Sequence, residues 1–163
     1  MDATAESTED GWTLVLVREL KHPPARVWTA LTEPAELAGW APFTAERALT
    51  RTGGLTLTMI DGDQHVDIAS TVTAVEPPRL LEYRWGGDRL RWELEPIGSG
   101  TRLTLRHLVA AREDLAKAAA GWHLCLDVAE RLLDGDPVEP IRGRAAMDHS
   151  WQRLHDDYAQ RLG

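Results

Sequence analysis

The amino-acid sequence predicts a single α+β domain in which a curved antiparallel sheet wraps a long helix and leaves an apolar cavity between them. From Ala45 to Val109 apolar and polar residues alternate with a period of two, broken by short turn sequences, as is typical of consecutive antiparallel strands. Residues 114–133 then carry apolar side chains at helical spacing. The 163 residues are enough to bury one substantial core.

The N-terminal elements are a short arm, a strand and two short helices. Residues 1–11 are acidic and polar, so we expect a disordered arm and no signal peptide. The segment from Trp12 to Leu20 is rich in Val and Leu and predicts a strand. Residues 24–40 show the apolar spacing of two short helices separated by Pro34, because proline ends a helix.

The period-two region contains six further strands. We expect them at Glu46–Arg51, Leu55–Ile60, Val66–Val75, Leu80–Trp85, Leu90–Glu95 and Arg102–Val109. Short turns such as Asp61-Gly62 imply that sequential strands are antiparallel neighbours, which makes a seven-stranded meander with the first strand. Leu90, Trp92 and Leu94 share one face of their strand, so one side of the sheet must be covered by another part of the chain.

The segment Asp114–Leu133 supplies that cover as a helix of about 30 Å. Gly121 lies inside it at a cost of ~1 kcal/mol relative to alanine, so it either allows a close approach to a strand or leaves room for a bound molecule. Residues 136–163 form an extended connector and a C-terminal helix over Arg144–Leu162. Met147, Trp151, Leu154 and Tyr158 form one stripe of that helix, which must pack on the domain or on a partner.

Composition excludes several classes of protein. The net charge of -8 disfavours nucleic-acid binding, because an acidic surface repels phosphates. No apolar run approaches the ~20 residues that span a membrane. Cys125 is the single cysteine, so no intrachain disulfide forms and we expect a cytoplasmic location.

Three segments together resemble a known family. They are PPARVWTALTEPAELAGW at 23–40, LRWELEP with GSGTRLTLRH at 90–107, and GWHLCLDVAERLLDG at 121–135. Over residues 12–135 their order and spacing resemble the activator of Hsp-ninety ATPase homologue-like family, within the superfamily of START domains, Bet v allergens and polyketide cyclases. The resemblance implies a helix-grip (START-like) fold.

The same resemblance implies that an apolar molecule, such as a lipid or an aromatic polyketide, binds inside the domain. Some members of the family, attached to a separate N-terminal domain, stimulate a chaperone ATPase. The 163 residues leave no room for that extra domain, so we do not expect a direct co-chaperone role.

The chemistry-bearing side chains form no recognisable catalytic motif. The six histidines lack an H-E-x-x-H pattern, and we expect no metal and no cofactor. His107 ends an apolar strand face, where it is either hydrogen-bonded within the sheet or acts as a polar handle for a ligand. Cys125 on the apolar stripe of the long helix is typical of a small core residue. His123 and Asp127 are expected to form a surface pair.

The candidate cavity residues come from three parts of the chain. They are Trp85, Trp92, Leu94, Leu105 and His107 from the sheet, Trp122, Cys125, Leu126 and Ala129 from the long helix, and Trp40 and Phe43 near the mouth. The leading hypothesis is a non-catalytic protein that binds an apolar or aromatic molecule. Two alternatives stay open. One is an enzyme of the cyclase/aromatase or hydratase kind, favoured by convergent polar groups in the pocket. The other is a chaperone-linked module or a homodimer formed through the C-terminal helix.

Overall fold

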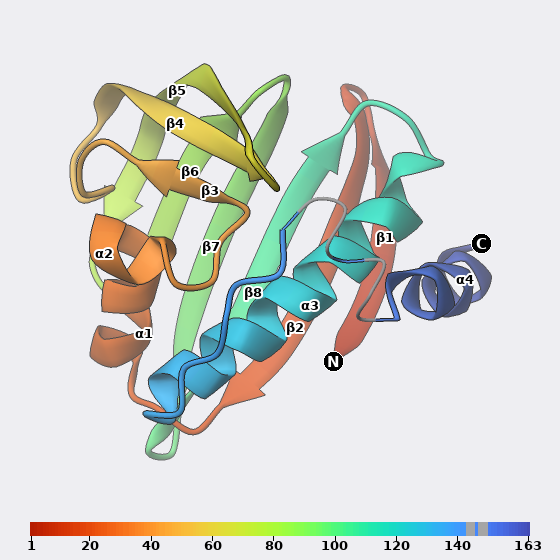
Figure 1. Ribbon diagram of the computed structural model, residues 1–163. Coiled ribbons are helices and arrows are strands. Elements are labelled where there is room, and N and C mark those ends of the chain that lie inside the picture. Colours follow the sequence, from red (N-terminus) through yellow and green to blue (C-terminus); the bar gives the residue numbers. More distant parts are fainter. Residues whose placement is uncertain (143–145, 147–149) are drawn as a thin grey trace.

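An eight-stranded antiparallel sheet curves around a long helix, as Figure 1 shows for the computed structural model. The structure describes residues 1–142, 146 and 150–163. The strands are β1 (Asp2–Thr8), β2 (Gly11–Leu20), β3 (Phe43–Ala45), β4 (Gly53–Asp61), β5 (Gln64–Glu76), β6 (Leu80–Trp85), β7 (Asp88–Ile97) and β8 (Gly100–Val109). They follow the order β1-β2-β8-β7-β6-β5-β4-β3, so β2 closes onto β8 and the other neighbours are sequential. The α+β arrangement of a sheet around a helix is therefore confirmed, with eight strands rather than seven.

The prediction of a strand over Glu46–Arg51 is wrong. The three-residue strand β3 lies just before this segment instead. The segment is a loop, and its backbone hydrogen-bonding groups find partners close by. The Arg47 guanidinium donates hydrogen bonds to the carbonyl oxygens of Ala48, Arg51, Gly53 and Gly54. The buried Leu49 donates its backbone N–H to Thr32. Because these groups already have partners, the loop does not need a neighbouring strand.

The disordered arm expected over residues 1–11 is also wrong, because residues 2–8 form β1. This strand pairs in antiparallel register with β2, from Asp2 opposite Val17 to Thr8 opposite Gly11. Ala3 and Ala5 alternate toward the core and pack against it. The polar composition concealed the strand, since its inward positions carry only small alanines.

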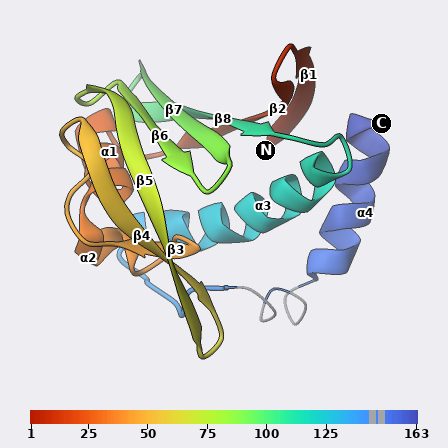
Figure 2. The same ribbon diagram turned by 90° about the horizontal axis from the view of Figure 1, so that it is seen from above.

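The described residues also form four helices: α1 (Pro24–Thr32), α2 (Pro34–Leu37), α3 (Asp114–Leu133) and α4 (Trp151–Leu162). Helix α3 lies across the inner face of the sheet, as the view in Figure 2 shows. Helix α4 packs against α3 and β1, and Tyr158 is fully buried there with its hydroxyl 2.7 Å from His123 Nδ1. The C-terminal helix expected from Arg144 begins at Trp151 in the described part. Residues 143–145 and 147–149, including Met147, lie outside the described residues.

Indole side chains join the sheet to α3. The rings of Trp92 and Trp122 meet edge to face with centroids 5.4 Å apart, and Trp40 lies 6.0 Å from Trp92. Trp92 donates its indole N–H to the Tyr83 hydroxyl, and Trp40 donates to the carbonyl of Ala30. Such pairs are stable because each buried indole has a hydrogen-bond partner. Sheet and helix are therefore in direct contact across the middle of the domain.

The outer face of the sheet carries a ladder of arginine and glutamate side chains. Arg91 lies 3.1 Å from Glu82, and Arg106 lies 2.8 Å from Glu93. Burial alone would raise the pKa of Glu93, but the guanidiniums of Arg106 and Arg91 outweigh it and lower that pKa. A groove of about 630 Å³ runs along this face, and its charged walls are part of the same ladder. These cross-strand ion pairs cover the solvent-facing side of the sheet.

Candidate ligand-binding cavity

A cavity of about 230 Å³ lies beside α3, between the ends of β6 and β8 and the connector that follows α3. Its walls are formed by Pro42, Trp85, His107, Lys117, Ala118, Gly121, Trp122, Leu124, Cys125, Ile141, Ala146 and Trp151. Most of these side chains are apolar or aromatic, as is usual for small-molecule sites. The Lys117 side chain is 57% exposed, so the cavity reaches the surface at this residue.

Three rings form the sheet-side wall. Trp85 is the last residue of β6, and its ring centroid lies 5.4 Å from Trp122 and 5.6 Å from His107. His107 projects from β8 and Trp122 from the apolar stripe of α3. Trp151 contributes a further ring from the start of α4, where it stacks on His155 at 5.0 Å. A flat apolar molecule would therefore meet aromatic faces and edges from several elements.

Gly121 provides the open space on the helix side. A Cβ atom built at this position meets nothing within 4 Å. The glycine is therefore not needed for a close approach between α3 and a strand, which was one of its two possible roles. Ala118 and Cys125, one turn on either side, are also small and line the cavity. The structure supports the role of leaving room at this point of α3.

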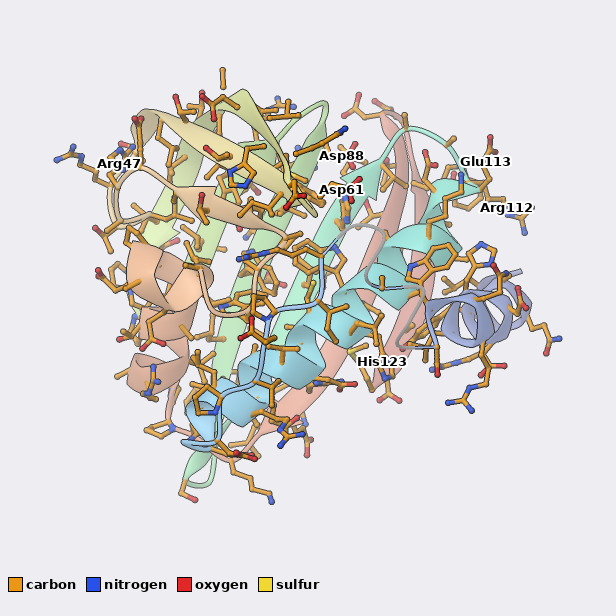
Figure 3. All side chains as sticks on the ribbon, viewed as in Figure 1. Arg47, Asp61, Asp88, Arg112, Glu113 and His123 are labelled. Atoms are coloured by element: carbon orange, nitrogen blue, oxygen red, sulfur yellow. The ribbon has the colours of Figure 1, made fainter. Side chains whose placement is uncertain are left out.

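The two ring nitrogens of His107 are both bonded to protein groups. Nδ1 lies 3.0 Å from the indole N–H of Trp122, and Nε2 lies 2.7 Å from a carboxylate oxygen of Asp88. Asp88 lies at the start of β7, at the end of the sheet where β8 finishes (Figure 3). An indole can only donate, so Nδ1 accepts and Nε2 carries the hydrogen that it donates to Asp88.

This geometry limits what His107 can do. The imidazole presents no free lone pair to a substrate, which a general base requires. It corresponds to the first of the two roles expected for His107, hydrogen bonding within the protein. Its polar atoms orient the Trp122 ring instead of facing into the cavity.

Cys125 is a buried thiol, 5% exposed. Burial raises its pKa to about 12, an effect that the nearby Arg142 only partly offsets. Its sulfur lies 4.0 Å from the carbonyl oxygen of Ile141, and no hydrogen bond joins it to His107 in the described part of the chain. The thiol therefore stays protonated near neutral pH and is a poor nucleophile.

The described part of the connector after α3, residues 136–142, forms another side of the cavity through Ile141. The Arg142 guanidinium donates hydrogen bonds of 2.8 Å to the carbonyl oxygens of Ala41 and Ala38, just after α2. Burial lowers the pKa of Arg142. These two bonds hold the connector across α3 and place Ile141 in the cavity wall.

Four of the eleven residues expected at the site line this cavity: Trp85, His107, Trp122 and Cys125. The other seven are buried in the packed core and do not line it: Trp40, Phe43, Trp92, Leu94, Leu105, Leu126 and Ala129. Sequence reasoning missed Pro42, Lys117, Ala118, Leu124, Ile141, Ala146 and Trp151. Gly121 was singled out as an unusual helical glycine, and it also lines the cavity.

The described residues include no group of three or more His, Cys, Asp or Glu side chains placed to hold a metal ion. Within the same part of the chain, none of the helices combines the length and apolar character needed to cross a membrane. The surface pair expected between His123 and Asp127 is present at 3.6 Å, away from the cavity.

A comparison with known protein families identifies the family of this chain. The family model described as activator of Hsp90 ATPase homolog 1-like protein matches residues 21–134, more than half of the sequence. The chain belongs to this family. Within the Hsp90-activator-like match lie α1, α2 and α3 and the strands β3 to β8, whereas β1, β2 and α4 fall outside it. No curated protein matches the sequence.

Solved structures share the fold of this family member. A conserved protein of unknown function from Enterococcus faecalis is 16% identical, with a TM-score of 0.74 over 98% of this chain and 89% of that one. CalU16 from Micromonospora echinospora is 20% identical, with a TM-score of 0.70 over 98% and 94% of the two chains. A protein from Bordetella parapertussis is 24% identical, with a TM-score of 0.71 over 99% and 96%. At these identities the likeness shows the fold alone.

Proposed function

We propose that this protein binds a small apolar or aromatic molecule in the cavity beside α3 and performs no chemistry on it. The observation that carries the proposal is the state of the polar groups in the wall. His107, Trp122 and Cys125 direct their polar atoms to other protein groups, so the inner surface offers a bound molecule mainly apolar contacts. Such a surface gains free energy by removing an apolar ligand from water.

The cavity volume sets the size of the ligand. About 230 Å³ exceeds the ~150 Å³ that accommodates benzene but is below the ~300 Å³ at which sites for drug-sized molecules begin. A ligand of one or two fused rings fits this range, and a complete lipid chain does not. A ring system of indole size buries about 200 Å². At ~20–30 cal/mol/Å² this corresponds to about 4–6 kcal/mol of transfer free energy. Because association also costs entropy, we expect a Kd no tighter than roughly 40 µM.

The cyclase/aromatase or hydratase alternative requires convergent ionisable groups around the substrate. The described wall contains His107 with both nitrogens bonded, the protonated Cys125 and Lys117 at the rim. None of these is placed as an acid–base pair, so binding is the better-supported function.

The interaction-module alternative depended on an uncovered C-terminal helix. Helix α4 packs on its own chain, where Tyr158 is buried and Leu154 and Leu162 contact the core. The described residues of α4 therefore supply no argument for a homodimer. Since the single cysteine is a buried free thiol, we also propose a reducing compartment such as the cytoplasm.

Neutral aromatic amides of increasing size provide the test: benzamide, 2-naphthamide and anthracene-2-carboxamide. We expect the indole N–H resonances of Trp85 and Trp122 to shift saturably with 2-naphthamide, while that of Trp28 in α1 stays in place. Benzamide should bind more weakly, and the three-ring amide should not enter.

Two variants distinguish the cavity from the surface. Gly121→Leu fills the cavity and should abolish the shifts. Gln160→Leu adds the same side chain to an exposed position of α4 and should leave them unchanged. If no probe gives a saturable shift in the unmodified protein, the proposed function is refuted.

A further inference from the structure

The cavity rim contains one charged side chain among the residues that line it in the described structure, Lys117. Lys117 is one helical turn before Gly121, so both lie on the same face of α3. Its side chain lines the cavity and is 57% exposed, so it lies where the cavity reaches the surface, while the interior beside Gly121 is apolar. The wall thus combines an uncharged interior with a cationic edge.

A ligand in this cavity must place its polar group at that edge. Inside, the acceptor Nδ1 of His107 is already bonded to Trp122, and the hydrogen on Nε2 is bonded to Asp88. A polar group buried there would find no partner, which is costly. The ring of the ligand therefore points inward, and its hydrophilic substituent faces outward beside Lys117.

The existing partner of Lys117 does not block this contact. Its ammonium lies 3.7 Å from a carboxylate oxygen of Asp114, one turn earlier on the same helix, and the two side chains are 57% and 44% exposed. Exposed ion pairs of this kind are weak and exchange readily. A ligand carboxylate held by the cavity could therefore share or replace this pair.

From this arrangement, and resting on the proposed function, we propose that the ligand is an aromatic anion. Its one or two rings occupy the cavity, and its carboxylate or similar acidic group pairs with Lys117. Three indoles surrounding a pocket in an acidic protein could also suit an organic cation. Lys117 at the rim opposes a cation, and Asp88, the carboxylate that contacts the wall residue His107, is already bonded to it.

Three probes with the same ring system separate these possibilities. 2-Naphthoate carries a negative charge, 2-naphthamide is neutral and 2-naphthylmethylamine is positively charged at pH 7.5. We expect 2-naphthoate to bind about 3–10-fold more tightly than the amide in isothermal titration calorimetry, as partly exposed charge-assisted hydrogen bonds allow. This preference should decrease between 20 mM and 300 mM salt, since salt screens an exposed pair.

The chain provides a matched control because it has only two lysines, Lys21 and Lys117. Lys117→Gln should remove the preference for 2-naphthoate over 2-naphthamide, measured as the ratio of the two dissociation constants in the same variant. Lys21→Gln makes the same change in net charge at an exposed position after β2 and should preserve the preference.

Each other outcome has a definite meaning. Equal affinity for acid and amide, or equal effects of the two lysine variants, would overturn the aromatic anion and leave the proposed function standing. Tightest binding of the amine would overturn it in favour of a cation. Failure of all three probes would refute the proposed function together with this inference.

Discussion

Replacing Gly121 tests the central feature of the site, the open space on the inner side of α3. A helical glycine costs about 0.5–1 kcal/mol relative to alanine through backbone entropy. The added methyl group of Gly121→Ala meets nothing within 4 Å, so no steric cost opposes that gain. We therefore expect stabilisation of about 0.5–1 kcal/mol, which raises Tm by about 1–4 °C for a chain of this size.

The measurement is thermal and urea unfolding followed by circular dichroism. A suitable contrast is Gly100→Ala at the start of β8, where the new methyl group would collide with the carbonyl oxygen of Leu20 and destabilise the fold. If Gly121→Ala also destabilises the protein, α3 lies closer to its neighbours than the structure shows. In that case the cavity, and every inference drawn from it, would be lost.

Three further predictions concern the groups around the cavity and the outer ladder. His107→Ala should cost about 2–4 kcal/mol in urea unfolding, because it leaves the Trp122 indole and Asp88 without their partner. Asp88→Asn keeps an acceptor and should cost less than half as much; equal costs would contradict the assigned hydrogen bonds. The pKa of Cys125, raised to about 12 by burial, keeps the thiol protonated at pH 7–9. It should react with a thiol reagent at least 100-fold more slowly in native protein than in urea, and fast native labelling would refute its burial. The pKa of Glu93 is lowered in the folded state, so its contribution to stability is present above its unfolded pKa of about 4.3 and is lost as pH falls through the folded value. Glu93→Gln should therefore flatten the loss of stability below pH 4.5 in acid titrations followed by circular dichroism, and an unchanged acid titration would contradict the lowered pKa.

The parts of the fold that sequence analysis predicted well have strong alternation and clear turns. The expected strand Leu80–Trp85 coincides with β6, and β7 and β8 extend the expected segments by a few residues. In these strands large apolar residues face inward and charged residues outward, so that both burial and hydrogen bonding favour the same register. The helix Asp114–Leu133 was equally clear because a wide apolar stripe must be buried.

The errors occur where local pattern and tertiary contacts diverge. Strand β1 has only Ala3 and Ala5 on its inward face, too little apolar surface to be recognised without its neighbours β2 and α4. The sequence around Arg47 resembles a strand because apolar and polar residues alternate in it. In the structure it is a loop, and the Arg47 guanidinium donates hydrogen bonds to its carbonyl oxygens. Periodicity cannot reveal such a side-chain contact.

Of the residues expected at the site, those near one end of the sheet line the cavity, whereas those in its middle are packed in the core. Trp92 and Leu94 were expected to line the cavity, but the rings of Trp40 and Trp122 pack against Trp92 at this point of the core. Which inward-facing residues touch each other depends on the curvature of the sheet and on the line that α3 follows across it. The wall contributed by Ile141 depends on the hydrogen bonds of the neighbouring Arg142 to the carbonyl oxygens of Ala38 and Ala41, which no periodic pattern reveals.

The same filled core explains why selectivity at this site would differ from that of an enzyme pocket. A pocket that hydrogen-bonds its ligand rejects close analogues strongly, because a missing partner leaves a buried polar group unsatisfied. At the proposed site Trp122, His107 and Asp88 satisfy one another, so these groups do not need a ligand as a hydrogen-bond partner. Analogues with the same ring size should therefore bind with similar affinity unless they differ at the rim, since only the volume beside Gly121 and the charge of Lys117 distinguish them.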